Sequence, residues 1–271
     1  MELDSKSRFR VKYCPCNKSN KDGKFVPFKD SERFGYCHSC EKTFRPDGYN
    51  YIEVKNKEPE APKEYFEKKY LKNLLFDYNI EGNNFVYFLE KTIGPIETEK
   101  ILVKYMLGTG PKNSVVFPFI DSSDNIVALK YMMYDSETGK RYNTIWYDET
   151  VKNRYKPCLF GLHLIKRERK PIAIVESEKT ACLMTYFHPY YTWLASAGFN
   201  GLTVDKFKPL RFHKVHLFPD VGKYEGWKEK KKELLKEYPF ADIEVSRECE
   251  LWFEKGQIEK GDDIADFYLR L

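Results

Sequence analysis

The feature that most constrains the fold is a short apolar run that leads an acidic residue into the start of a helix. Residues 172–175 form a strand pattern of four apolar residues, and Glu176 follows directly. A helical pattern occupies 178–187, and a second strand pattern follows at 191–195. A strand, a helix and a strand in close succession predict parallel strands joined by a crossover helix. In such a sheet, ligands and catalytic groups gather at the carboxyl ends of the strands.

The same alternation continues to the end of the chain. Further strand patterns occupy 215–218 and 243–245, and helical patterns occupy 227–238 and 264–271. The sequence therefore predicts an α/β fold over 170–271, with a compact parallel sheet flanked by helices.

Acidic residues stand at three positions of this region. Glu176 and Asp220 each follow a predicted strand, and Asp263 lies in a segment that also contains Asp262 and Asp266. Carboxylate oxygens are the ligands that hard divalent cations prefer. We therefore expect a Mg²⁺ or Mn²⁺ site at the carboxyl edge of the sheet.

Bulk composition limits the class of protein. The chain has 271 residues, of which 42% are hydrophobic and 32% charged, with a net charge of +5. These values indicate a soluble globular protein of two or three domains. No apolar run is long enough for a membrane span, and the first residues lack the apolar core of a secretory signal. Seven unevenly placed cysteines favour metal binding in a reducing compartment, so we expect a cytoplasmic protein.

Two cysteine pairs organise residues 1–50. Cys14 and Cys16 are separated by 20 residues from Cys37 and Cys40, and hairpin-like sequence lies between the pairs. Two thiolate pairs brought together by a hairpin predict a zinc ribbon with a structural, four-cysteine zinc site. His38 is an alternative fourth ligand. Lysines and aromatic residues alternate here, which suits single-stranded DNA, although the aromatic rings also suit packing of a small core.

Between the ribbon and the α/β region we expect a linker at 51–64, a helical segment at 65–110 and a basic β-rich subdomain at 111–169. Residues 152–170 carry seven lysines and arginines against one acid, Glu168. A basic flank beside an acidic metal site suits a polyanionic substrate, and a solvated charged turn is the alternative for 166–170. The residues that we expect to hold nucleic acid or nucleotide here are Lys130, Lys140, Arg141, Arg154 and Lys156.

In this order, the motifs resemble those of DnaG-type bacterial primases and their relatives in mobile elements and phages. The cysteine pairs are similar to the primase zinc-binding domain. The segments VVFPFID (115–121), LFGL (159–162), ESEKTA (176–181), FPD (218–220) and KGDDIADF (260–267) resemble motifs of the basic subdomain and of the toprim domain. The resemblance covers nearly the whole chain.

The resemblance implies a toprim domain that carries out metal-dependent nucleotidyl transfer on single-stranded DNA for primer synthesis. Glu176, Asp220 and Asp263 would be catalytic, and Lys179 would join the nucleotide-binding residues. The implied partners are NTPs and a replicative helicase or another replication protein. The chain departs from the family where Gly222 replaces the second aspartate of a D-x-D motif, and we expect Glu225 to substitute for it.

Two other functions fit the same residues. A DNA-binding accessory protein of a mobile element would keep the fold but lose polymerisation through Gly222. A toprim-type nuclease would use the same carboxylates for hydrolysis.

Overall fold

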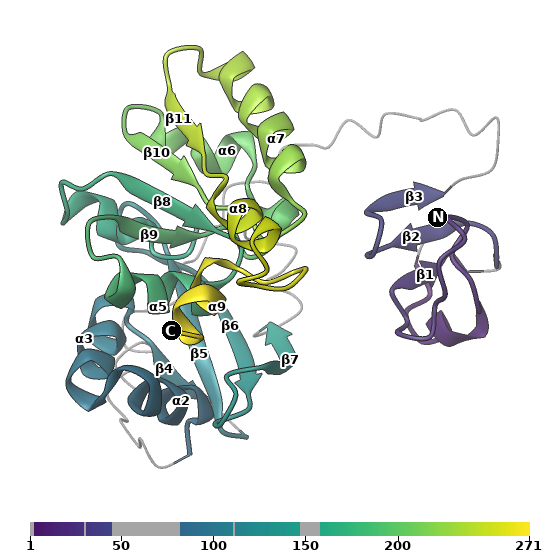
Figure 1. Ribbon diagram of the computed structural model, residues 1–271, viewed down its shortest axis with the longest axis horizontal. Helices are drawn as coiled ribbons and strands as arrows, with labels where there is room; N and C mark the ends of the chain where they lie inside the picture. Colours follow the sequence, from purple (N-terminus) through teal and green to yellow (C-terminus); the bar gives the residue numbers. More distant parts are fainter. Residues whose placement is uncertain (1–2, 30, 45–81, 111, 147–157) are drawn as a thin grey trace. The chain divides into compact units, whose positions relative to one another are not determined.

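The computed structural model describes residues 3–29, 31–44, 82–110, 112–146 and 158–271 (Figure 1). The chain divides into two compact units, residues 1–58 and 59–271. Within the described residues, no helix has the length and apolar character that crossing a membrane requires.

The first unit is a small antiparallel sheet with the order β1-β2-β3. Its elements are η1 (Arg8–Arg10), β1 (Phe25–Pro27), β2 (Gly35–Cys37) and β3 (Lys42–Phe44). Phe25 and Val11 pack with Cys14 and Cys37 in its core. The buried side chain of Asn20 links two backbone segments. Its amide nitrogen donates to the Val11 and Phe25 carbonyls, and its oxygen accepts from the Phe25 amide. This core is small, and two of its four buried residues are the cysteines Cys14 and Cys37.

The second unit begins with two helices packed on an antiparallel sheet of order β4-β5-β6-β7. The elements are α2 (Asn84–Ile93), α3 (Pro95–Tyr105), β4 (Gly108–Gly110), β5 (Ser114–Ile120), β6 (Ile126–Tyr134) and β7 (Arg141–Trp146). Asn83 caps α2 by accepting from the Phe85 and Val86 amides. β5 and β6 form a hairpin and are buried along their full length.

A parallel sheet of order β11-β10-β8-β9 follows. Its strands are β8 (Ile172–Val175), β9 (Thr192–Ala195), β10 (Lys214–Leu217) and β11 (Asp242–Val245). The helical elements around it are η2 (Leu162–Lys166), α5 (Glu178–Phe187), η3 (Phe199–Gly201), α6 (Val204–Phe207), η4 (Lys208–Leu210), α7 (Tyr224–Glu237), α8 (Glu248–Glu254) and α9 (Ile264–Leu269).

Alternate residues of β8 enter two different cores, as the two-residue period of a strand requires. Ala173 and Val175 join the larger core, which also contains residues of α2, α3, β5 and α5. Ile172 and Ile174 join a second core with Trp227 of α7. In Figure 1, α5 lies between the parallel sheet and α3, and α9 packs beside it. Both faces of the sheet are therefore covered at β8, which explains why all four residues of this strand are apolar.

The predicted mixed α/β class is confirmed. Within the expected helical segment at 65–110, α2 and α3 pack on the antiparallel sheet and their buried faces complete its core, and strand β4 follows α3. The expected linker and the first helical pattern lie outside the described residues. The five domain boundaries stay predictions.

Candidate functional site

Glu176 lies one residue beyond the carboxyl end of β8, partly exposed. The indole Nε1 of Trp227 donates a hydrogen bond of 3.1 Å to its carboxylate Oε1. Trp227 is fully buried on α7. The Glu176 carbonyl accepts from the Gly198 amide at 2.8 Å, which joins the β8 end to the turn before η3. The strand therefore fixes the position of Glu176, and a buried indole fixes one of its oxygens.

Asp220 lies three residues beyond β10, the strand that pairs with β8. Burial raises the pKa of its carboxyl well above the ordinary value, and the negative charges of Glu176, Asp263 and Asp266 add to this effect. These four carboxyls are therefore close enough to interact electrostatically. The positive charge of Lys223 lowers the pKa of Asp220 and so opposes part of this rise.

Asp263 is the N-cap of α9. Its Oδ1 accepts from the Ala265 amide at 2.8 Å and the Asp266 amide at 3.2 Å, and its Oδ2 accepts from the Thr180 hydroxyl on α5. Asp266 completes a capping box by accepting from the Asp263 amide. Burial raises the pKa of Asp263, and Lys179 opposes this rise. Asp263 thus serves the fold as a helix cap and also contributes charge near Asp220.

The acidic residues gather without forming a tight ligand shell. In the described part of the chain, only the four cysteines bring three or more potential ligand atoms within 4.8 Å of one another. Asp262 is also occupied elsewhere, since its carboxylate accepts from the Arg270 guanidinium and the Glu259 amide. The oxygen-donor set suits a hard cation in type. Asp262 is the least available of the predicted ligands.

Glu225 does not take the place that the sequence predicted for it. It lies in the first turn of α7, its side chain is 77% exposed, and it pairs with Lys228 at 3.0 Å. The carboxylate that reaches the Gly222 position is that of Glu250 on α8, which accepts from the Gly222 amide at 2.8 Å. Both glutamates line an open cavity of about 540 Å³ with Gly222 and Arg247. Glu225 therefore lies at the same cavity as Gly222 but is paired with Lys228, and its role as a substitute ligand stays a prediction.

Lys130 is not a surface cation. It is 5% exposed on β6, and its ammonium bonds both oxygens of Glu178 on α5, at 2.8 and 3.0 Å. Glu178 is 1% exposed. Burial lowers the pKa of Lys206 nearby, and the Glu178 charge opposes this. A buried charge requires a partner, and each residue of this pair supplies one for the other. The pair therefore joins β6 of the antiparallel sheet to α5, the helix that begins two residues after Glu176.

The other predicted cations are distributed unevenly. Lys140 and Arg141 are exposed at the start of β7. Lys179 is partly buried, with its ammonium 5.9 Å from the centre of the Phe88 ring. Arg154 and Lys156 lie outside the described residues.

The cations of 166–170 do not flank Glu176. They precede β8, whereas Glu176 follows it, and four strand residues span about 13 Å. The basic run and the acidic residues therefore lie at opposite edges of the parallel sheet. The expectation of a basic flank beside the acidic site is wrong for 166–170.

The four cysteines converge in the first unit, as the sequence predicted. All four Sγ atoms lie within 4.8 Å of one another, and Cys14 Sγ accepts from the Cys16 amide at 3.4 Å. Zinc–sulfur bonds of about 2.3 Å place the sulfurs of a tetrahedral site about 3.8 Å apart, so this set fits zinc. His38 is not part of the cluster.

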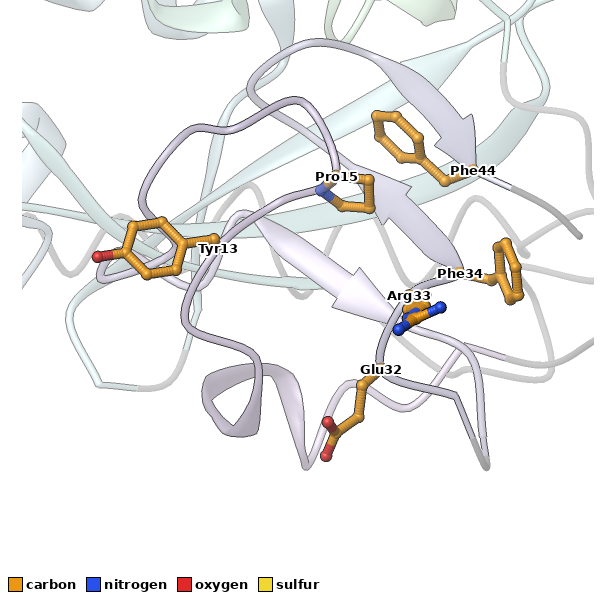
Figure 2. A pocket seen from close by; sticks show the side chains of 6 residues that line it. All are labelled: Tyr13, Pro15, Glu32, Arg33, Phe34 and Phe44. Carbon is orange, nitrogen blue, oxygen red and sulfur yellow. The ribbon is translucent and has the colours of Figure 1, made fainter.

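A shallow pocket of about 370 Å³ lies next to the cysteines (Figure 2). It is lined by Tyr13, Pro15, Glu32, Arg33, Phe34 and Phe44. Phe25 and Phe28 are buried, which fits the packing role for these rings. The most exposed aromatic side chains among the described residues of this unit are Phe9 and Tyr13, each 66% exposed.

Residues 83–221, just over half of the chain, match the family described as Domain of unknown function (DUF6371). The chain belongs to the DUF6371 family. No curated protein matches it in sequence.

Among solved structures, this DUF6371 chain is similar to the DnaG catalytic core, with a TM-score of 0.51, 12% identity, and coverage of 75% of this chain and 77% of that chain. It is similar to the DnaG primase catalytic domain bound to ssDNA, with a TM-score of 0.48, 13% identity, and coverage of 75% and 78%. It is also similar to the zinc-binding and RNA polymerase domains of Aquifex aeolicus primase, with a TM-score of 0.42, 17% identity, and coverage of 65% of this chain and 51% of that chain. The likeness to the DnaG catalytic core confirms the primase-like fold.

Three residues of the DUF6371 site escaped the sequence analysis. Trp227 and Thr180 contact predicted site carboxylates, and Glu250 contacts Gly222. Trp227 was predicted only as part of a helix, and α8, which carries Glu250, was not predicted.

Proposed function

We propose that this chain is a primase-like protein of the mobile-element type, which uses a toprim domain for metal-dependent nucleotidyl transfer on single-stranded DNA. The observation that supports this most is the gathering of Glu176, Asp220 and Asp263. They come from the ends of two paired parallel strands and from the cap of α9. Burial raises the pKa of Asp220, and the charges of Glu176 and Asp263 raise it further. Carboxylates that repel one another in a partly buried place favour a divalent cation.

In this proposal, Glu176 and Asp220 are the principal oxygen donors, and Asp263 and Asp266 contribute negative charge. A bound Mg²⁺ or Mn²⁺ would activate a 3′-hydroxyl and neutralise charge on the triphosphate. Trp227 orients the Glu176 carboxylate through its indole. Glu176 as a general base is the alternative role. Lys179 and Lys223 lie close enough to act on Asp263 and Asp220, and we assign them to the phosphates of the nucleotide.

The remaining partners follow from the same function. NTPs are the substrates, Lys140 and Arg141 contact the template, and a structural zinc held by Cys14, Cys16, Cys37 and Cys40 stabilises the first unit. A replicative helicase or another replication protein would recruit the chain. We expect it to act in the cytoplasm.

Primer synthesis tests the proposal. Zinc-loaded protein is incubated with single-stranded templates, labelled NTPs, and Mg²⁺ or Mn²⁺. We expect short primers from the wild type and none from Glu176→Gln. Absence of product across several templates and both metals, with folded wild-type protein, would rule the proposal out.

A second function has a specific observation in its favour. Gly222 supplies no carboxylate where the resemblance expects one, and Asp262 and Asp263 are already bonded to Arg270 and Thr180. Since ligand number sets metal affinity, a DNA-binding accessory protein without turnover fits these contacts. Salt-dependent single-strand binding that is unchanged by Glu176→Gln, with no primer made, would identify this function. Metal-dependent turnover that the same substitution abolishes would exclude it.

A further inference from the structure

The parallel sheet has a second exposed edge, opposite the acidic residues. Because all four strands run in the same direction, the residues that precede them share one edge. Figure 1 shows α8 near the arrowhead ends of the strands, so this amino edge lies on the other side of the sheet. Four residues each stand two positions before a strand, in the spatial order Phe240, Phe212, Lys170 and Tyr190.

The three aromatic residues of this row are the most exposed aromatic side chains in the described part of the chain. Phe240 is 100% exposed, Phe212 84% and Tyr190 78%. Phe212 and Phe240 precede a paired position, Lys214 with Asp242, and Lys170 and Tyr190 precede another, Ile172 with Thr192. Neighbouring strands lie about 4.8 Å apart, so the row extends about 14 Å along the edge. Exposed rings at this density indicate a binding surface.

The edge is also strongly basic at its centre. Residues 166–170 and 208–214, which lead into the two central strands, carry seven lysines and arginines against the single acid Glu168. One oxygen of Glu168 is bonded to Lys104 at 2.5 Å, and the other lies 4.0 Å from the ammonium of Lys170. Lys166, Arg169 and Lys208 have no ion-pair partner within the described ranges. The guanidinium of Arg211 lies 4.4 Å from the centre of the Phe212 ring. The basic surface ends near Phe240, where the acidic residues Glu237 and Asp242 lie on either side in the sequence.

We propose that this amino edge binds single-stranded nucleic acid, with bases stacked on Phe212, Phe240 and Tyr190 and phosphates held by Arg169, Lys170 and Arg211. Rings alone would also suit a protein partner, but rings interleaved with an excess of cations match a polyanion with exposed bases. The surface lies about 13 Å or more from Glu176, the length of β8, so it is separate from the candidate active site. The proposal goes beyond primer synthesis, because it needs no chemistry at the acidic edge.

Fluorescence anisotropy with a labelled oligodeoxythymidylate tests the stacking. In the full-length protein, Phe212→Ala with Phe240→Ala should weaken binding by roughly tenfold or more. Tyr87→Ala, which removes an exposed ring from α2, is the matched control and should leave the affinity unchanged. All three side chains are exposed, so the variants should fold, and circular dichroism checks this.

The salt dependence tests the charges. Arg169→Gln with Lys170→Gln should reduce the slope of log affinity against log salt by about 1.4, which is about 0.7 for each phosphate contact on a single strand. Lys100→Gln, an exposed lysine on α3, is the control for lost charge. Photo-crosslinking to a 5-iododeoxyuridine strand should yield adducts on peptides that contain Phe212, Phe240 or Tyr190.

Unchanged affinity and slope in these variants, or adducts confined to other surfaces, would overturn the proposal. If the phenylalanine variants alter sedimentation of the protein but not strand binding, the edge is an interface between copies of this chain, and the proposal is wrong. Glu176→Gln should not affect strand binding at this edge, so failure of primer synthesis and failure of this inference are separate results.

Discussion

The indole Nε1 of Trp227 lies 3.1 Å from Oε1 of Glu176, and this hydrogen bond connects a fully buried side chain to the carboxylate at the end of β8. The indole has no acceptor capacity, so it can only donate, and it favours the ionised form of the glutamate. Trp227 is therefore a positioning residue, since it acts on the site only through Glu176.

Trp227→Phe removes the donor and keeps most of the buried volume. We expect primer synthesis to fall about 10- to 100-fold, as is typical when a residue that orients a metal ligand is lost. The value of kcat should fall, and the Mg²⁺ concentration needed for half-maximal activity should rise.

Trp193→Phe is the matched control. Its indole donates to the His188 carbonyl at 2.8 Å, and the ring is equally buried. The two variants should lose similar stability in urea unfolding, and only Trp227→Phe should lose activity. Equal activities in the two variants would show that the Glu176 contact has no positioning role.

The buried pair of Lys130 and Glu178 should be essential to the stability of the second unit. Lys130→Met leaves the Glu178 charge without this partner in an apolar setting, and we expect a loss of about 3–5 kcal/mol in the free energy of unfolding. The double variant with Glu178→Leu should recover most of this loss, because the uncompensated charge is gone. Urea titration measures both, and a double variant no more stable than the single one would contradict the expected coupling.

His163 should make the second unit sensitive to mild acid. Burial lowers the pKa of this imidazole, and its Nε2 lies 3.2 Å from the Lys104 carbonyl. Below its ordinary pKa of about 6.5, the unfolded chain binds a proton that the folded protein resists, so stability falls as the pH falls.

We therefore expect the His163 contribution to be fully present above pH of about 6.5 and to decline below it, with a slope that approaches about 1.4 kcal/mol per pH unit. His163→Gln should flatten the pH dependence of the unfolding free energy over this range, whatever its effect on absolute stability. Parallel curves for wild type and variant would contradict this assignment.

Removal of zinc should unfold the first unit. We expect about one zinc ion per chain in the wild type and almost none in Cys37→Ser, because the site needs its full set of four ligands. Hydrogen exchange should then show loss of protection in residues 3–44 and little change in 158–271. Cys158→Ser, outside the cluster, is the control and should retain zinc.

Local pattern predicted the four strands and the helices α5, α7 and α9 of 170–271, and it missed the short helices α6 and α8. Strand β8 and helix α5 fall where the apolar run and the helical spacing placed them, because both elements are buried on their expected faces. The cysteine cluster was equally predictable, since ligand spacing in sequence determines it. The mixed α/β class follows from these elements alone.

Side-chain partners were not predictable in the same way. Lys130 was interpreted as a phosphate contact, but Glu178, 48 residues away, holds it in the interior. The basic run at 166–170 was placed beside Glu176 because the two are close in sequence, whereas a strand between them separates them in space. Charge pattern reports how many cations a segment has, and only the topology decides which edge they occupy.

The contacts of Asp263 have a consequence for any mutational survey of this protein. The carboxylate caps α9, bonds Thr180 on α5 and lies close enough to raise the pKa of Asp220. Alanine at this position would release the C-terminal helix at the same time as it removed a charge, so inactivity alone would not distinguish the two effects. Asp263→Asn keeps one carbonyl oxygen for the cap of α9, and it replaces the oxygen that accepts from Thr180 with an amide nitrogen. It removes the charge without releasing the helix, which makes it the more informative substitution.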